Sequence, residues 1–138
     1  MTAAPPAFEW LAHVRVDVGE PQDLGSDISG GRRVVPIRGG EVTGSWTGRI
    51  LAGGADWQTV LEDGSVRIDA RYPIHLDGVG PVLFRVRGAR PSNNAATDTF
   101  CTTLLVDGAA GSAIGRAAYA TVGSKVPGRI EYDVFEIR

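Results

Sequence analysis

One carboxylate stands in a sequence context that suits acid–base chemistry. Asp56 follows the pair Gly53 and Gly54 and precedes Trp57 and Gln58. A carboxyl group held against an aromatic wall, partly out of water, has a raised pKa and can exchange protons near neutral pH. The alternative is that Asp56 is structural and accepts backbone N–H bonds within a turn. The catalytic interpretation requires that Asp56 reach a cavity.

Three further polar side chains are spaced for one face of a strand. Asp69, Arg71 and His75 lie two and four residues apart, so their side chains point to the same side. If that side lines an interior, an acid, a guanidinium and an imidazole would suit binding of a carboxylate or enolate with proton transfer. If it faces solvent, it is an ordinary salt-bridged surface, and Tyr72 on the apolar side places its hydroxyl inside. The apolar character of that opposite side favours the second arrangement.

The remaining candidates would hold a substrate rather than transform it. Arg32 and Arg33 follow a Ser-Gly-Gly loop, where the guanidinium of one of them could reach the mouth of a barrel and bind an anion bidentately, or simply be solvated. Trp10 and Trp46 each lie on the expected packed side of a strand and are either core or a pocket wall. The catalytic candidates are therefore Asp56, Tyr72 and Arg71, and the substrate-binding candidates are Trp57, Gln58, Arg32, Trp46, Asp69 and His75.

Short strands must position these residues. Apolar and polar side chains alternate over residues 8–18 and 66–76, which is typical of half-buried strands, and 19 glycines and 8 prolines divide the chain with turns. The pattern suits a sandwich or a barrel. We expect an all-β protein, a single small antiparallel β-barrel of about eight to ten strands with at most one short helix. Expected strands cover 8–18, 34–37, 41–51, 57–61, 66–76, 81–87, 99–106 and 129–137, with loops at 20–31 and 88–96, a break at Gly39 and Gly40, and the helix within 109–119, capped by Ser112.

Length and composition limit the classes of protein. A chain of 138 residues suits one domain, and we expect residues 1–7 to be a flexible tail and residues 8–138 a single barrel domain. The net charge of −2, without a basic block, argues against nucleic acid or an anionic membrane as partner. Without a signal peptide or a long apolar run, we expect a cytoplasmic protein. The lone Cys101 is expected to be small and buried, and with no Cys/His cluster we expect neither a metal nor a cofactor.

The order of short motifs along the chain resembles a known family. The motifs are G-R-R-V-V-P-I at 31–37, G-G-A-D-W-Q at 53–58, D-A-R-Y at 69–72 and D-G at 77–78. They resemble a family of small, mostly bacterial proteins catalogued as a domain of unknown function. The resemblance implies a β-barrel loosely similar to those of allene oxide cyclase and dirigent proteins.

The second half departs from the pattern of that family. Where the family carries Phe-Glu-Thr this chain has Phe100-Cys101-Thr102, and where it carries Trp-Leu-Asn-Arg this chain has alanine, isoleucine, glycine and arginine at 113–116. If the missing carboxylate, indole and amide line the usual pocket, this chain has a wider or more apolar pocket and a different ligand.

Two functions fit these residues. The first is a cofactor-free acid–base enzyme, a cyclase, isomerase or lyase acting on a small organic substrate, because such chemistry needs shape and one proton shuttle. The second is a non-catalytic carrier or sensor that uses the same pocket. In either case we expect a small organic ligand and a homo-oligomer, most simply a homodimer.

Overall fold

Antiparallel strands form almost all of the regular structure in this computed structural model, which describes residues 3–92, 99–109 and 112–138. A single 3₁₀ turn, η1 (Ala113–Arg116), is the only helical element in these ranges, and Ser112 caps it through the Ile114 amide. The all-β prediction is confirmed. The strands are β1 (Phe8–Val18), β2 (Gln22–Asp27), β3 (Gly30–Gly44), β4 (Gly48–Ile50), β5 (Ala55–Val60), β6 (Val66–Leu76), β7 (Gly80–Arg90), β8 (Thr99–Asp107), β9 (Ala118–Val126) and β10 (Arg129–Ile137).

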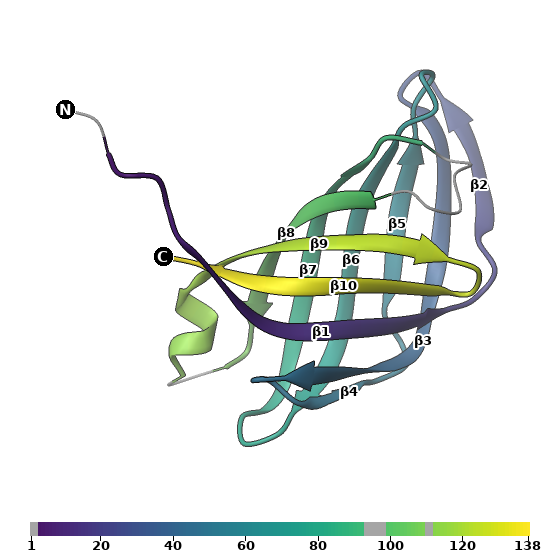
Figure 1. Ribbon diagram of the computed structural model, residues 1–138. Coiled ribbons are helices and arrows are strands. Elements are labelled where there is room, and N and C mark those ends of the chain that lie inside the picture. The colour runs from purple at the N-terminus through teal and green to yellow at the C-terminus, as the bar shows by residue number, and fades with distance from the viewer. Residues whose placement is uncertain (1–2, 93–98, 110–111) are drawn as a thin grey trace.

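The sheet closes on itself into a barrel, as predicted (Figure 1). Around the barrel the order is β1-β10-β9-β8-β7-β6, followed by β4 and β5, and then β3, which pairs back with β1. The short strands β4 and β5 both lie between β3 and β6, one beyond the other, and occupy one position in the ring. Closure through β1 and β3 removes the exposed edges that an open sheet would leave unpaired, except along β2, which pairs with β3 alone among the described strands.

Two interruptions in the wall flank the long strand β3, one on each side. β1 and β2 both pair with the long strand β3, and residues 19–21 form a bend between them. On the other side of β3, residues 51–54 separate β4 from β5. Gly54 lies against β6, where an added Cβ would stand 2.5 Å from the Arg71 carbonyl oxygen. A glycine is therefore required in this part of the G-G-A-D-W-Q motif by the close approach of two strands.

The interior is built from the apolar rows that the alternation predicted. In β6, Ile68, Ala70, Tyr72, Ile74 and Leu76 are all buried, whereas the Arg71 side chain is 53% exposed. This confirms that Tyr72 points inward and that Asp69, Arg71 and His75 share the outer side. Trp46 packs against Phe84 and Tyr119, so it belongs to the core.

Several predicted boundaries are wrong. The expected break at Gly39 and Gly40 is absent, because β3 runs through it. Gly40 has φ +142°, and a Cβ there would lie 1.9 Å from the Arg15 carbonyl oxygen, so this glycine lets β3 pass close to β1 instead of ending it. The expected loop 20–31 contains β2, and β9 was not predicted at all. The expected loop 88–96 begins later than predicted, because β7 reaches Arg90. Three stretches with predictions lie outside the described ranges: residues 93–96 of this loop, 1–2 of the expected tail and 110–111 of the expected helix.

Two side chains also lie elsewhere than predicted. Trp10 was expected on the packed side of β1 but is 47% exposed, because the register of β1 against β10 shifts between Trp10 and Ala12. Cys101 is exposed on the outer side of β8, because the alternation of that strand turns Phe100 and Thr102 inward instead.

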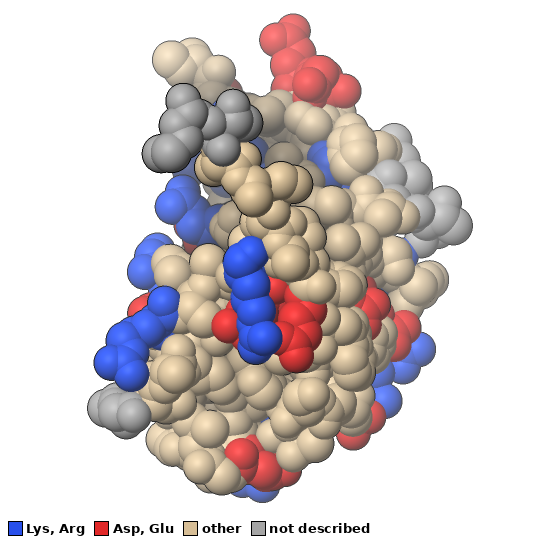
Figure 2. All heavy atoms as spheres, turned by 60° about the vertical axis from the view of Figure 1, so that its left-hand side comes forward, with Lys and Arg blue, Asp and Glu red and all other residues tan. Residues whose placement is uncertain are grey.

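The charged surface is mixed. On the face shown in Figure 2, acidic and basic side chains lie among one another and among uncharged residues. Within the described part of the chain, no helix is long and apolar enough to cross a membrane.

Candidate functional site

A cavity of about 470 Å³ lies inside the barrel, at the end where β1 bends into β2. The turn between β9 and β10 borders it, with Pro127 and Gly128 among its lining residues. Its walls are largely apolar and come from strands all around the barrel. They include Val16 of β1, Ile37 of β3, Ile68 of β6, Val86 of β7 and Phe100 of β8. Its volume falls within the range of roughly 300 to 1,000 Å³ found for small-molecule sites.

Asp56 lies in the wall of this cavity and is only 7% exposed. Its Oδ1 accepts the backbone N–H of Asp69 at 3.1 Å. The ladder between β5 and β6 pairs Asp56 with Ala70, then skips two residues and resumes at Thr59 with Arg67. At this gap in the ladder the Asp56 carboxylate accepts a backbone N–H bond, and it also borders the cavity. The sequence suggested that Asp56 either accepts backbone N–H bonds or reaches a cavity, and in the structure it does both.

Burial raises the pKa of Asp56 above its usual value, because an ionised carboxylate is disfavoured away from water. The hydrogen bonds from Gln58 and from the Asp69 amide act in the opposite direction, as does the positive charge of Arg90. Burial prevails over these three effects. The carboxyl group therefore takes a proton more readily than an exposed aspartate does.

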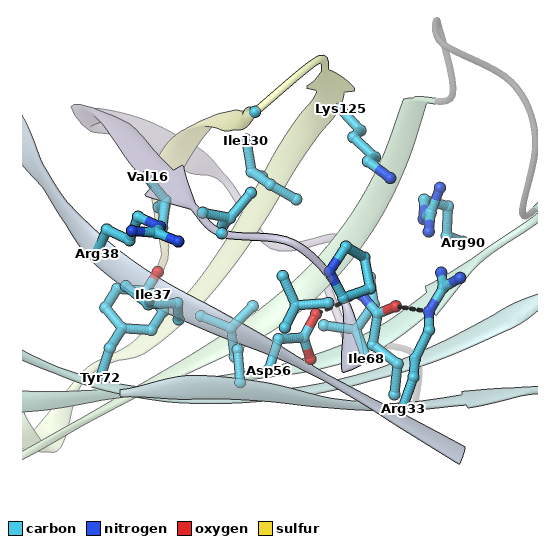
Figure 3. Close-up of a pocket in the computed structure, with 18 of the residues that line it drawn as sticks. Val16, Arg33, Ile37, Arg38, Asp56, Ile68, Tyr72, Arg90, Lys125 and Ile130 are labelled. Atoms are coloured by element: carbon cyan, nitrogen blue, oxygen red, sulfur yellow. Dashed lines mark hydrogen bonds between the residues drawn. The ribbon is translucent and has the colours of Figure 1, made fainter. Parts of the chain in front are cut away.

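A chain of side-chain hydrogen bonds joins Asp56 to a cation. Gln58 Nε2 donates to Asp56 Oδ2 at 2.6 Å, and Arg33 Nε donates to Gln58 Oε1 at 2.7 Å (Figure 3). Gln58 is itself buried and lines the cavity, as does Arg33. Since the guanidinium can only donate, it determines which end of the Gln58 amide faces Asp56.

Two tyrosine hydroxyls meet inside the barrel. Tyr72 of β6 and Tyr132 of β10 both line the cavity, are almost completely buried, and hydrogen-bond to each other through their hydroxyl groups. Burial raises the pKa of both well above the usual value for tyrosine, so both are neutral near pH 7. Of the two hydroxyl hydrogens, the shared bond uses one, and the second remains available to another acceptor.

Four cationic side chains line the same cavity: Arg33, Arg38, Arg90 and Lys125. In Figure 3, Arg33, Arg90 and Lys125 gather toward one end, Arg38 and Tyr72 lie toward the other, and Asp56 lies between. Arg90 is only 2% exposed. This arrangement gives an apolar cavity a positively charged end.

Of the predicted site residues, the cavity brings together Asp56, Tyr72 and Gln58. The other candidates lie elsewhere. Arg71 pairs with Asp69 at 3.9 Å on the outer side of β6, and Arg32 pairs with Asp27 at 3.7 Å. Trp57 is 55% exposed, His75 lies on the outer side of β6, and Trp46 is in the core. Trp57, Arg32 and Asp69 border a second, more open groove that extends from β2 and β3 across β5, β6 and β7 to β8. Arg33, Gln58 and Ile68 line both this groove and the cavity.

Sequence reasoning missed the cavity residues Arg38, Arg90, Lys125 and Tyr132, and of Arg32 and Arg33 it selected Arg32, whereas Arg33 is the one that lines the cavity. Three of these residues continue buried rows and could have been found from alternation. Arg33 shares a side of β3 with Val35 and Ile37, Arg90 follows Val86 on β7, and Tyr132 lies between Ile130 and Val134 on β10. No comparable signal pointed to Lys125, because β9 was not predicted.

The positions at which the chain departs from its resemblance do not line this cavity. Cys101 points outward, and η1 borders a small depression next to Val106 and Asp107. The expectation that these substitutions widen the pocket therefore does not apply to this cavity. Among the described residues, no three His, Cys, Asp or Glu side chains come together in a way that could hold a metal ion.

Comparison with known proteins gives a family and a fold. Residues 6–102 match the family described as protein of unknown function (DUF3237). A UPF0311 protein of Clostridium acetobutylicum is 35% identical over 85 residues, which are 60% of this chain and 54% of that protein, so the chain spans about half the length of the curated relatives it matches.

Solved structures share the barrel over nearly the whole chain. A crystal structure of a protein with unknown function from Clostridium acetobutylicum has a TM-score of 0.88 at 24% identity and covers 99% of this chain and 100% of its own. A structure described as an enzyme from Penicillium herquei has a TM-score of 0.79 at 19% identity and covers 100% of this chain and 98% of its own. At these identities the likeness establishes the fold alone. The expected similarity to allene oxide cyclase and dirigent barrels stays a prediction.

Proposed function

This chain belongs to the DUF3237 family of proteins of unknown function, and from its cavity we propose that it is a cofactor-free acid–base enzyme acting on a small organic substrate. The observation that carries the proposal is Asp56, a buried carboxyl with a raised pKa in the wall of an apolar cavity. Perturbed carboxyl groups in such cavities are the usual general acids and bases of enzymes.

In the proposed reaction, Asp56 removes a proton from a substrate carbon next to a carbonyl group. The electron pair of the broken C–H bond moves into the carbonyl, whose oxygen becomes an enolate. The free hydrogen of the Tyr72–Tyr132 pair donates to that oxygen, since both hydroxyls are neutral. Asp56 then returns the proton to another atom in an isomerisation. In a lyase reaction the enolate electron pair expels a leaving group from the neighbouring carbon, and this group departs with the electrons of its broken bond and takes the proton from Asp56. In a cyclisation the enolate carbon attacks an unsaturated carbon of the same substrate, the π electrons of that double bond move to its far atom, and Asp56 returns the proton to that atom.

The surroundings of Asp56 support this role. Gln58 and the Asp69 amide hold the carboxylate in one orientation, and the alternation of β5 places it on the buried side, in the wall of the cavity. A general base works best when its pKa approaches the working pH, and burial moves the pKa of Asp56 in that direction.

The fungal structure of the same fold, described as an enzyme, supports the view that this barrel can house an active site. At 19% identity it supports neither a particular reaction nor a particular residue.

A carrier or sensor is the second candidate, and one observation favours it. Both oxygens of Asp56 already accept hydrogen bonds, one from Asp69 and one from Gln58, as expected for a structural carboxylate. In that case the cavity would bind the same kind of ligand and leave it unchanged.

An enzyme and a carrier differ in whether they exchange the α-protons of a bound substrate with solvent. We would incubate the protein in D₂O with a panel of small aromatic ketones and keto acids, beginning with 2-tetralone, and follow loss of the α-proton signals by ¹H NMR. The enzyme is expected to accelerate exchange, and Asp56→Asn to lower the rate by about 10²- to 10⁴-fold. Asp107→Asn, an exposed carboxylate at the end of β8, serves as the matched control. Saturable binding of the panel without any exchange would establish the carrier and contradict the enzyme.

A further inference from the structure

The cavity wall is rich in cationic side chains although the protein is acidic. The whole chain has 14 Lys and Arg against 16 Asp and Glu. Among the residues that the structure describes, four cationic side chains and two carboxylates, Asp56 and Glu20, line the cavity, and burial favours the neutral form of Asp56. An excess of positive charge in an enclosed, largely apolar space attracts anions and is screened little by salt.

Arg33 is available to a ligand. Its Nε donates to Gln58, which holds the guanidinium in place, and no carboxylate lies within ion-pair distance of it among the residues that the structure describes. Its two terminal amino groups are thus presented at the cavity. A guanidinium held by its Nε is well suited to bind a planar carboxylate through two parallel N–H···O bonds.

Arg90 and Lys125 reinforce the same end of the cavity. Arg90, from the last position of β7, is buried, and Lys125, from β9, points toward it and toward Arg33 in Figure 3. Both residues also interact with other parts of the protein. Three cations from three different strands thus converge beside apolar walls.

We propose that this cavity binds an organic carboxylate, with its charged head between Arg33, Arg90 and Lys125 and its apolar body along Ile68 and Ile130 toward the two tyrosines. The proposal rests on the proposed function in taking this cavity as the ligand site, but it does not require turnover. A free inorganic anion would leave the apolar walls in contact with water, so they favour a ligand with a hydrophobic body.

Binding of such a ligand would also act on Asp56. The charge of Arg90 lowers the pKa of Asp56. A bound carboxylate beside Arg90 offsets that charge and adds a negative one, so the pKa of Asp56 rises further. The ligand would thereby bring its own general base closer to the working pH.

A pair of probes of the same shape tests the charge preference. We would measure binding of naphthalene-2-carboxylate and of its neutral analogue naphthalene-2-carboxamide to the full chain by isothermal titration calorimetry. The carboxylate is expected to bind at least ~10-fold tighter than the amide, a difference of about 1.4 kcal/mol. Arg33→Gln should remove most of this preference, whereas Arg49→Gln, an exposed arginine of β4, should retain it.

Each outcome bears on the proposal. Equal affinities of the two probes, or no saturable binding of either at millimolar concentration, would overturn it. So would an equal loss of preference in Arg33→Gln and Arg49→Gln. If Arg33→Gln fails to fold, Lys125→Gln is the second variant, and the comparison of probes on the unaltered chain needs no variant. Failure of this proposal can be distinguished from failure of the proposed function. If the protein prefers the carboxylate but shows no proton exchange that depends on Asp56, the carboxylate site stands and only the proposed enzymatic activity is contradicted.

Discussion

Gln58 donates its side-chain amide to Asp56 Oδ2 at 2.6 Å from a position two residues further along the same strand. The spacing of two places both side chains on the inner side of β5, while Trp57 between them points outward. The amide of Gln58 thus stands between the carboxylate and Arg33. This contact determines both the orientation and part of the electrostatics of the candidate site.

Removing that amide should make Asp56 a weaker acid. In Gln58→Leu, the carboxylate loses the strongest of the interactions that oppose the effect of burial, so we expect the pKa of Asp56 to rise above that in the unaltered protein. The measurement is a ¹³C NMR titration of the Asp56 carboxyl carbon. Gln22→Leu, at an exposed position of β2, is the control and should leave the titration unchanged. An unchanged or lower pKa in Gln58→Leu would show that Gln58 does not hold the charged form.

The raised pKa of Asp56 also predicts how stability depends on pH. Because the folded state binds this proton more tightly than the unfolded state, the contribution of Asp56 to stability is greatest below the unfolded value of about 3.8 and falls as pH rises through the folded value. Asp56→Asn cannot ionise. We therefore expect the Tm difference between Asp56→Asn and the unaltered protein to shift in favour of the variant as pH increases from about 4. A difference that is constant with pH, followed by circular dichroism, would contradict the raised pKa.

The hydroxyl pair should show strong coupling. Tyr72→Phe leaves the Tyr132 hydroxyl buried without its partner, and Tyr132→Phe does the converse, so each change should cost about 1 to 3 kcal/mol in the free energy of unfolding. The double variant has no orphaned hydroxyl and should lose less than the sum of the two single changes. Urea unfolding of all four proteins completes the cycle. Additive losses would mean that the two hydroxyls contribute independently.

The close approach of Gly54 to β6 predicts a large effect from one methyl group. In Gly54→Ala, the new Cβ would stand 2.5 Å from the Arg71 carbonyl oxygen and from Tyr72 Cβ, and relief of this overlap should cost about 1 to 3 kcal/mol. The matched control is Gly39→Ala in β3, whose nearest neighbour is the Ile50 carbonyl oxygen at 3.7 Å. That change should be neutral or slightly stabilising, because alanine restricts the unfolded chain. Equal Tm values for the two variants would contradict the structure around Gly54.

Local pattern was sufficient for much of the framework. The bounds of β1, β6 and β10 follow from the alternation of apolar and polar side chains, and the inward side of β6 with Tyr72 follows from its apolar row. Asp56 and Gln58 were singled out together, and they do share a side and a cavity. These features depend on neighbours within a few residues, which a sequence shows directly.

The rest depended on contacts between distant parts of the chain. The sequence around Gly40 predicts a strand break, whereas in the structure this glycine allows β3 to lie close to β1. The buried hydroxyl of Tyr132 finds its hydrogen-bond partner in Tyr72, sixty positions earlier. Arg33, Arg90 and Lys125 come from three strands whose convergence exists only once the sheet has closed. The alternation of side chains along a strand shows which residues share a side. Only closure of the barrel decides which side becomes the interior and which charged side chains meet there. The sequence by itself therefore determined strands such as β1, β6 and β10 and the leading carboxylate, and the tertiary structure decided the cavity, its cations and its hydroxyl pair.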